Sequence, residues 1–136
     1  MSESSNVSST RLKQIMPSFT VGDIEASLAY YQGVLGFTVV ERWENDGKLL
    51  GASIAAGDVM LMLGQDDWAQ GRNRQKGAGF RLNCTTEQNV DDLAAAIKAR
   101  GGELAHEPTD QPWGARDFSI VDPDGFKISI SYQTEH

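Results

Sequence analysis

Apolar and polar residues alternate with a period of two in several short stretches of the N-terminal half, which is typical of half-buried strands. The first stretch covers residues 14–21, where Pro17 favours an edge position or a local irregularity. Apolar residues at helical spacing follow over 24–35, with Asp23 as the N-cap and Gly36 at the end. Three further strands are predicted at 37–44, 49–56 and 59–63. The first half is therefore predicted to run as strand, helix and three strands.

The same order of elements is predicted for the C-terminal half. Residues 79–84 alternate, and apolar residues at helical spacing over 90–97 precede Gly101, which favours the end of a helix. The remaining elements are a short strand at 103–106, a loop holding Pro108 and Pro112, and two strands at 115–121 and 126–132. The repeated order indicates a duplicated unit.

A tight turn is predicted between the last two strands. Its sequence is Asp122-Pro123-Asp124-Gly125, in which proline suits the first corner and glycine a left-handed position. Asp122 and Asp124 could also be considered an acid pair, but their placement around Pro123 favours a turn-forming role.

The length of 136 residues fits one domain with a single core. We predict a disordered tail at 1–10 and one α+β domain over 11–136. Within it, module one covers about 12–64, a polar linker covers 65–77 and module two covers about 78–133. The charged residues of the linker are expected to be solvated: Asp66, Asp67, Arg72, Arg74 and Lys76.

The alternation assigns two faces to each predicted sheet, and the helix should cover the more apolar one. The helix-side residues are Phe19, Val21, Val59, Leu61, Leu63, Phe80, Leu82, Ile128 and Ile130. The opposite face carries Met16, Ser18, Thr20, Met60, Met62, Gly79, Arg81, Asn83, Lys127, Ser129 and Ser131. This mixture of polar and soft apolar side chains is typical of a ligand-facing surface.

Several short motifs resemble the glyoxalase, bleomycin-resistance and extradiol-dioxygenase superfamily, also called vicinal oxygen chelate. They are the run from Val21 to Leu28, Tyr30-Tyr31, Leu35-Gly36-Phe37, Gly57-Asp58, Pro112-Trp113-Gly114 and Asp122-Pro123-Asp124-Gly125. The resemblance covers roughly residues 12–133. It implies two βαβββ modules that form a curled eight-stranded mixed sheet with helices on the outer face, usually in a homodimer.

Metal-dependent members of that superfamily hold a divalent ion with side chains from the first and last strand of each module. By resemblance those positions are Met16, Met62, Gly79 and Ser129, and all four lie on the face opposite the helices. Such ions need several oxygen or imidazole donors, which two thioethers, a glycine and a hydroxyl do not supply. We therefore predict no metal site, no cofactor and no catalytic residues of the usual kind.

Charge and composition indicate which classes of partner this chain can bind. The net charge of −7 disfavours nucleic acid and anionic membranes, and no stretch approaches the roughly 20 apolar residues of a membrane span. The single cysteine, Cys84, cannot form an internal disulfide, which agrees with a cytoplasmic location. A small molecule and a second copy of the chain are the expected partners, and the acidity is compatible with a cationic ligand.

The candidate ligand-binding residues fall into three groups. Trp43 and Trp113 offer aromatic faces for planar or cationic groups, although loop packing is an equally ordinary role for tryptophan. Arg81 and Arg116 are candidates for orienting an anion, and each could instead pair with a neighbouring carboxylate. The third group lines the predicted cleft and comprises Met16, Ser18, Met60, Met62 and Ser129.

Three functions follow from these observations. The leading hypothesis is a metal-free protein resembling bleomycin-resistance proteins, which encloses a small aromatic or cationic molecule. The alternative is a glyoxalase-like lyase or isomerase, or a dioxygenase-related enzyme, with a non-standard site. A third possibility is a regulatory module whose cleft has become an ordinary core.

Overall fold

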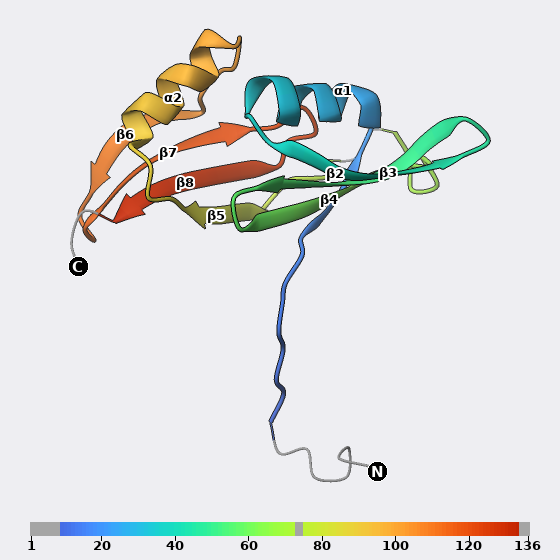
Figure 1. Cartoon of the computed structure of the whole chain (residues 1–136), viewed down its shortest axis with the longest axis horizontal. Helices are drawn as coiled ribbons and strands as arrows, with labels where there is room; N and C mark the ends of the chain where they lie inside the picture. Colours follow the sequence, from blue (N-terminus) through green and yellow to red (C-terminus); the bar gives the residue numbers. More distant parts are fainter. Residues whose placement is uncertain (1–8, 73–74, 134–136) are drawn as a thin grey trace.

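Two four-stranded mixed sheets, each covered on one face by a helix, make up this chain (Figure 1). The computed structural model describes residues 9–72 and 75–133. Module one contains β1 (Ser18–Val21), α1 (Ile24–Ala29), η2 (Tyr30–Val34), β2 (Thr38–Asn45), β3 (Lys48–Ala56) and β4 (Val59–Gln65). Module two contains β5 (Arg81–Thr85), α2 (Val90–Ala99), β6 (His106–Gln111), β7 (Ala115–Val121) and β8 (Lys127–Gln133). The predicted α+β fold with two βαβββ modules is confirmed.

Each module has the same strand order. In module one the order is β1-β4-β3-β2, and in module two it is β5-β8-β7-β6. The first and last strands of each module pair in parallel, and the other pairs are antiparallel. The eight strands thus form two separate sheets among the described residues, rather than one continuous sheet.

The first strand is shorter than predicted and begins at Ser18. Pro17 has no N–H to donate, although its carbonyl accepts a hydrogen bond from the Met62 N–H at 2.9 Å. The segment before it extends away from the body of the molecule (Figure 1), with Leu12 84% and Ile15 87% exposed. The predicted tail at 1–10 lies outside the described residues except for 9 and 10, which are exposed.

Both helices begin with a side-chain cap. The Asp23 carboxylate accepts a hydrogen bond from the Ala26 N–H at 3.2 Å, and the Asn89 side chain accepts one from the Asp92 N–H at 3.0 Å. The first helix continues beyond α1 as the π-helical turn η2 and stops before Gly36, whose φ is +85°. The N-cap and the glycine stop were both predicted.

The prediction for β6 was wrong, because residues 106–111 form a strand where a loop was expected. Pro108 lies inside this strand, and the register with β7 shifts between His106 and Thr109. Since β6 is an edge strand, the missing proline N–H interrupts a ladder on one side only. The predicted strand at 103–106 is reduced to its last residue.

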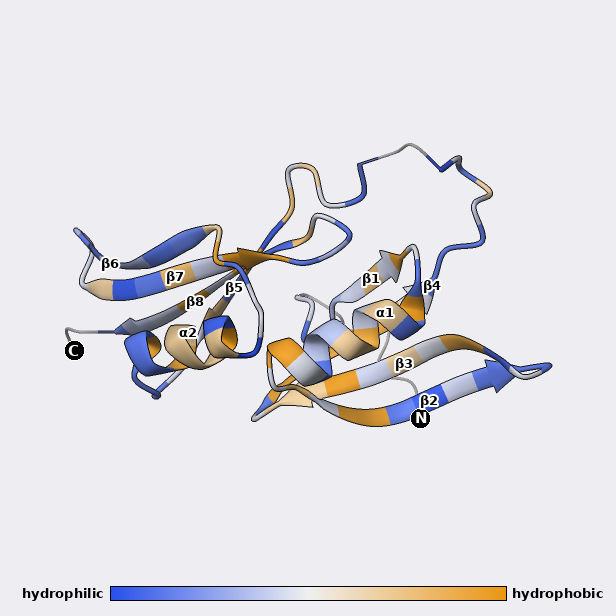
Figure 2. Cartoon of the chain, turned by 90° about the horizontal axis from the view of Figure 1, so that it is seen from above, coloured by the Kyte–Doolittle hydropathy of each residue, from blue (hydrophilic) through white to orange (hydrophobic). Residues whose placement is uncertain are grey.

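One apolar core lies on the helix side of both sheets. The predicted helix-side residues Phe19, Val21, Leu61, Leu63 and Ile128 are all at most 2% exposed. The rings of Phe19 and Phe126 stack at 4.4 Å and join the two modules. Figure 2 shows the apolar residues concentrated on α1 and β3, whereas β6 is mostly hydrophilic. Phe80 departs from the prediction because it is 38% exposed.

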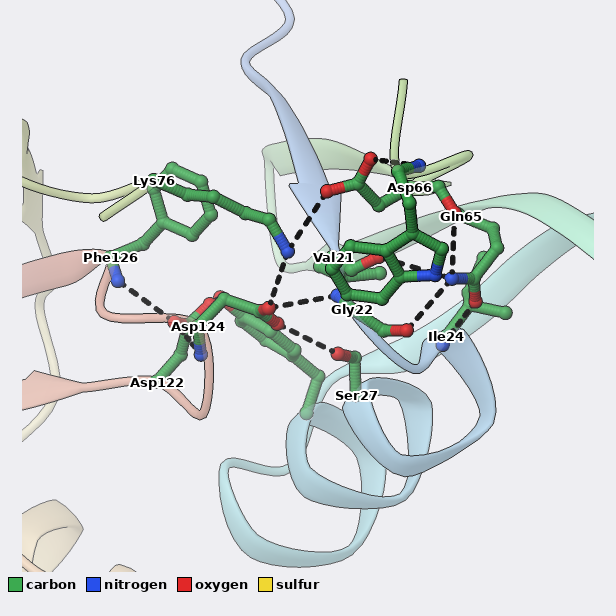
Figure 3. A network of polar contacts seen from close by, with 12 residues as sticks. Val21, Gly22, Ile24, Ser27, Gln65, Asp66, Lys76, Asp122, Asp124 and Phe126 are labelled. Carbon is green, nitrogen blue, oxygen red and sulfur yellow. Dashed lines mark hydrogen bonds and ion pairs between the residues drawn. The ribbon is translucent and has the colours of Figure 1, made fainter. Parts of the chain in front are cut away.

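A buried ion-pair network ties the linker to both modules (Figure 3). The Lys76 ammonium lies 3.2 Å from an Asp66 carboxylate oxygen and 3.3 Å from an Asp124 oxygen, and its side chain is 8% exposed. Asp124 also accepts a hydrogen bond from the Gly22 N–H at 2.8 Å. The expectation of a solvated linker was therefore wrong for Asp66 and Lys76, while Arg74 lies outside the described residues.

The predicted turn at residues 122–125 is present and reaches into module one. The Asp122 carboxylate accepts hydrogen bonds from the N–H groups of Asp124 and Phe126, at 2.9 and 2.8 Å. Its other oxygen accepts one from the buried Tyr31 hydroxyl at 2.7 Å. Burial raises the pKa of Asp122, and this hydrogen bond from Tyr31 opposes the rise. The turn thus contributes to the junction between the modules.

No helix in the described part of the chain combines the length and apolar content needed to cross a membrane.

Candidate ligand-binding site

A cavity of about 660 Å³ lies on the free face of the module-two sheet. The strands β5, β6, β7 and β8 supply most of its lining, and Trp113 lies beside it, 67% exposed, in the loop between β6 and β7. Arg81, Asn83, Lys127 and Ser129 line it, as expected for the face opposite the helix. This volume falls in the range of small-molecule sites.

The strand register orders the lining side chains into three rows across the sheet. The first row holds Arg81 beside Lys127. The second runs Asn83, Ser129, Ser119 and His106, and the third runs Thr85, Ser131 and Asp117. The surface is therefore cationic at one end, hydroxyl-rich and amide-bearing in the middle, and acidic at the other end.

One hydroxyl in the middle row lacks a partner. Ser119 is 4% exposed, and its Oγ makes no hydrogen bond to any described residue. A buried polar group without a partner costs about 1–3 kcal/mol, so the position favours an additional group that supplies the missing hydrogen bond. His106, which pairs with Ser119 across β6 and β7, is exposed and also lines the cavity.

The structure brings together only some of the predicted site residues. Arg81, Trp113 and Ser129 line the cavity. The module-one candidates do not: Met16, Ser18, Met60 and Met62. Figure 1 shows α1 and α2 on the same side of the two sheets, and all the described residues that line the cavity belong to module two or to the loop between β6 and β7.

Two other candidates have roles outside the cavity. Trp43 on β2 pairs with Gly51 on β3, and a Cβ added at Gly51 would lie 3.0 Å from the indole. The ring therefore covers the glycine backbone. Trp43 remains 40% exposed and is a surface residue of module one.

Arg116 makes ion pairs with carboxylates. Its guanidinium donates two hydrogen bonds to Asp91, at 2.8 and 2.9 Å, and one to Asp110 at 3.2 Å. The hydrogen bond from Arg116 holds the pKa of Asp91 below its usual range. Arg116 lies beside a second depression of about 360 Å³, with Asp91, Asn89 and Tyr132. Of the two alternatives for this arginine, the structure shows the pairing with carboxylates.

The four positions that hold the metal in metal-dependent members do not fit such an ion here. Met62 lies on β4 and Ser129 on β8, in different sheets, while Met16 and Gly79 precede β1 and β5. Two thioethers, one hydroxyl and a glycine provide too few hard donors. The described residues also contain no group of three or more His, Cys, Asp or Glu side chains that could hold a metal ion.

Sequence reasoning missed several residues that line the cavity. Asn83 and Lys127 were assigned to the correct face but not to the site, and Asp117 and His106 were not connected with it. The alternation of β7 placed Asp117 and Ser119 on one face, which was an available signal. His106 carried no such signal, because its strand was predicted at 103–106, whereas in the structure it begins at His106.

Comparison with known proteins gives the family. The profile of the Glyoxalase/Bleomycin resistance protein/Dioxygenase superfamily matches residues 11–130, and the chain belongs to that superfamily. The resemblance seen in the sequence is thereby confirmed.

Individual relatives come from both binding proteins and enzymes. The chain is 30% identical over 132 residues to the bleomycin resistance protein of Geobacillus stearothermophilus, covering 88% of this chain and 96% of that protein. It is 28% identical over 130 residues to the lactoylglutathione lyase of Neisseria meningitidis serogroup A, covering 84% and 93%. The crystal structure of TnmS3, an antibiotic binding protein from Streptomyces sp. CB03234, aligns with a TM-score of 0.70 at 23% identity, over 92% of this chain and 99% of that one. The last comparison supports the fold.

Proposed function

We propose that this chain binds a small molecule without a metal ion, in a cleft that a second copy of the chain completes. The observation that carries the proposal is the cavity on module two, with its hydroxyl, amide and cationic lining. Met16, Met62, Gly79 and Ser129 stand at the positions that hold the ion in metal-dependent members, and they provide too few hard donor atoms for a divalent ion. The relative named as a bleomycin resistance protein supports binding rather than catalysis as the first hypothesis.

A second copy is proposed because one chain supplies only half of a cleft. Module two provides the cavity, and no described residue of module one lines it. The free face of module one carries the half-buried Met16, Met60 and Met62, whose flexible thioethers suit contact with a varied apolar surface. The exposed Leu12 and Ile15 on the extended N-terminal segment would gain burial in the same assembly.

Charge and composition support the proposal that the chain acts in the cytoplasm and binds neither nucleic acid nor membranes. A net charge of −7 disfavours nucleic acid and anionic membrane surfaces. A lone, half-buried Cys84 without a disulfide supports the cytoplasm as the place of action. The hypothesis of a closed, filled core is less favoured because the cavity is large enough for a ligand.

The first test is native purification without an affinity tag, followed by mass spectrometry of co-purifying molecules and elemental analysis for Ni, Zn, Fe and Mn. The expected result is a bound organic molecule, a dimer by analytical ultracentrifugation and no stoichiometric metal. Stoichiometric metal that is lost on substituting Met62 and Ser129 by alanine would contradict the metal-free proposal.

The second test separates drug binding from other ligands and from catalysis. Titration calorimetry against bleomycin and planar antibiotics measures drug binding directly, and no heat with any of them would remove the drug hypothesis. The enzyme alternative is favoured by the similarity to lactoylglutathione lyase. It predicts turnover of the hemithioacetal of methylglyoxal and glutathione, measured with and without added Ni²⁺ or Zn²⁺.

A further inference from the structure

Two cationic side chains lie next to each other at one end of the cavity. Arg81 on β5 and Lys127 on β8 are direct partners in a parallel register, and both line the cavity. Neighbouring strands lie about 4.8 Å apart, and registered residues point to the same face. Neither side chain forms a hydrogen bond or an ion pair with any described residue.

Such an arrangement is unfavourable for the free protein. Like charges directly opposite each other on neighbouring strands destabilise a sheet. The sole carboxylate among the described lining residues is Asp117, whose register partner is Ser131, four residues along β8 from Lys127. That separation is about 13 Å, which exceeds the screening length of about 8–10 Å in physiological salt. Asp117 therefore does not neutralise the cationic pair.

Hydrogen-bonding groups occupy the middle of the cavity. Asn83 and Ser129 are register partners next to the cationic row, and Ser119 follows on β7. The Ser119 hydroxyl is buried and lacks a partner among the described residues. Asp117 accepts a hydrogen bond from Gln111 at 2.9 Å. A bound molecule with polar groups along its length would satisfy this row.

We propose that the ligand of this cavity carries an oxyanion, a carboxylate or a phosphate, which Arg81 and Lys127 hold together. Its polar body hydrogen-bonds to the hydroxyl and amide groups around Ser129. This inference rests on the proposed function and names the ligand class for the same site. It replaces the cationic ligand expected from the net charge, because the local charge at this end of the cavity has the opposite sign.

The test compares two aromatic probes of similar size and opposite charge, naphthoate and naphthylmethylammonium. Each is titrated into the full chain by calorimetry. Naphthoate is expected to bind at least about tenfold more tightly, because a charge-assisted hydrogen bond contributes at least that factor. Inorganic phosphate is expected to compete with naphthoate.

The variant Lys127→Gln separates a binding role from a structural one. It should lower naphthoate affinity about tenfold or more, while the urea midpoint of the free protein stays equal or rises, because a like-charge contact is relieved. Lys98→Gln is the matched control. Lys98 is on α2, on the opposite side of the sheet, and pairs with Glu107 on the surface. It changes the net charge equally and should leave naphthoate affinity unchanged.

Several outcomes of these titrations would overturn the inference. They are equal or tighter binding of the ammonium probe, unchanged naphthoate affinity in Lys127→Gln, and an equal loss of affinity in Lys98→Gln. Failure of naphthoate to bind would also overturn it. If naphthoate does not bind but an organic molecule is found on the natively purified protein, the proposed function stands and the inference of an oxyanion ligand does not.

Discussion

The hydrogen bond between Tyr31 and Asp122 gives a quantitative test of how the two modules are held together. The Tyr31 side chain is 0% exposed, and its hydroxyl donates to an Asp122 oxygen at 2.7 Å across the module boundary. The substitution Tyr31→Phe removes this hydroxyl and little else. Asp122 keeps its two backbone hydrogen bonds, but its second oxygen loses the tyrosine.

The expected decrease in the free energy of unfolding depends on pH. A hydrogen bond to an ionised group contributes about 1.5–3 kcal/mol, and one between neutral groups about 1 kcal/mol. Burial raises the pKa of Asp122 above its unfolded value of about 3.9, and the Tyr31 hydrogen bond lowers it again. Removing the hydroxyl therefore raises the pKa of Asp122 further.

The direction of this pH dependence follows from the linkage between proton binding and folding. A carboxyl whose folded pKa is raised contributes stability that is complete below the unfolded pKa and is lost as the pH rises through the folded pKa. Because the variant raises that pKa further, it loses more stability at high pH. We expect Tyr31→Phe to cost about 2–3 kcal/mol at pH 8 and about 1 kcal/mol near pH 3.5, which lies below the unfolded pKa of about 3.9.

The assay is urea denaturation of both proteins at the two pH values and at one protein concentration, since dimerisation would link stability to concentration. Tyr30→Phe is the matched control. Tyr30 is half-buried, and its hydroxyl makes no hydrogen bond to a described residue, although burial raises its pKa to about 12. This control should change stability by less than about 0.5 kcal/mol. An equal cost of Tyr31→Phe at both pH values would refute the reasoning.

Three further predictions concern the junction and the surface. Lys76→Met should cost about 3–5 kcal/mol in urea denaturation, because it removes one partner from a buried ion pair; a loss below about 1 kcal/mol would contradict this. Gly77→Ala should destabilise by about 2–3 kcal/mol or more, since an added Cβ would overlap the Gly125 carbonyl, whereas Gly33→Ala meets nothing within 4 Å and should be neutral or stabilising. Arg116→Gln should shift the urea midpoint less than Lys76→Met and leave naphthoate affinity unchanged, because its partners Asp91 and Asp110 are exposed; loss of binding would place this arginine in the ligand site.

The local chemistry of the chain predicted most of the elements. Asp23 as a cap, Gly36 as a stop and the strand at 115–121 are decided by neighbouring residues, and all three agree with the structure. Pro108 misled the prediction because its cost depends on position in the sheet. Proline is tolerated on an edge strand, and edge position is a property of the whole topology.

The charged residues at the junction could not be predicted from their neighbours in sequence. Asp66 and Lys76 lie in a polar linker, where solvation is the ordinary expectation. One of the two carboxylates that pair with Lys76 is distant in sequence, because Asp124 is 48 residues away and approaches Lys76 only in the folded chain. The hydrogen bond between Tyr31 and Asp122 joins residues 91 positions apart, so the contact of this turn with module one could not be predicted from neighbouring residues either.

For the candidate site too, the features set by neighbouring residues could be predicted, and those set by the whole fold could not. Alternation placed Arg81, Asn83, Lys127 and Ser129 on one face correctly, because the period of a strand is a local property. It also placed Met16 and Met62 on a free face, and the family resemblance suggested that both faces line one cleft. Within one chain, no described residue of module one lines the cavity on module two.

The described lining of the cavity comes from one module alone, and this decides what is needed to close it. A ligand on module two meets only one wall, which leaves much of a small molecule in contact with solvent, whereas typical sites bury most of the ligand surface. If the second wall comes from another copy, ligand binding and dimerisation stabilise each other by the same free energy. The cationic pair adds a reason for this coupling, because enclosing Arg81 and Lys127 without an anion would bury two uncompensated charges. An oxyanion ligand would remove that penalty. A negatively charged ligand would therefore favour assembly of the cleft.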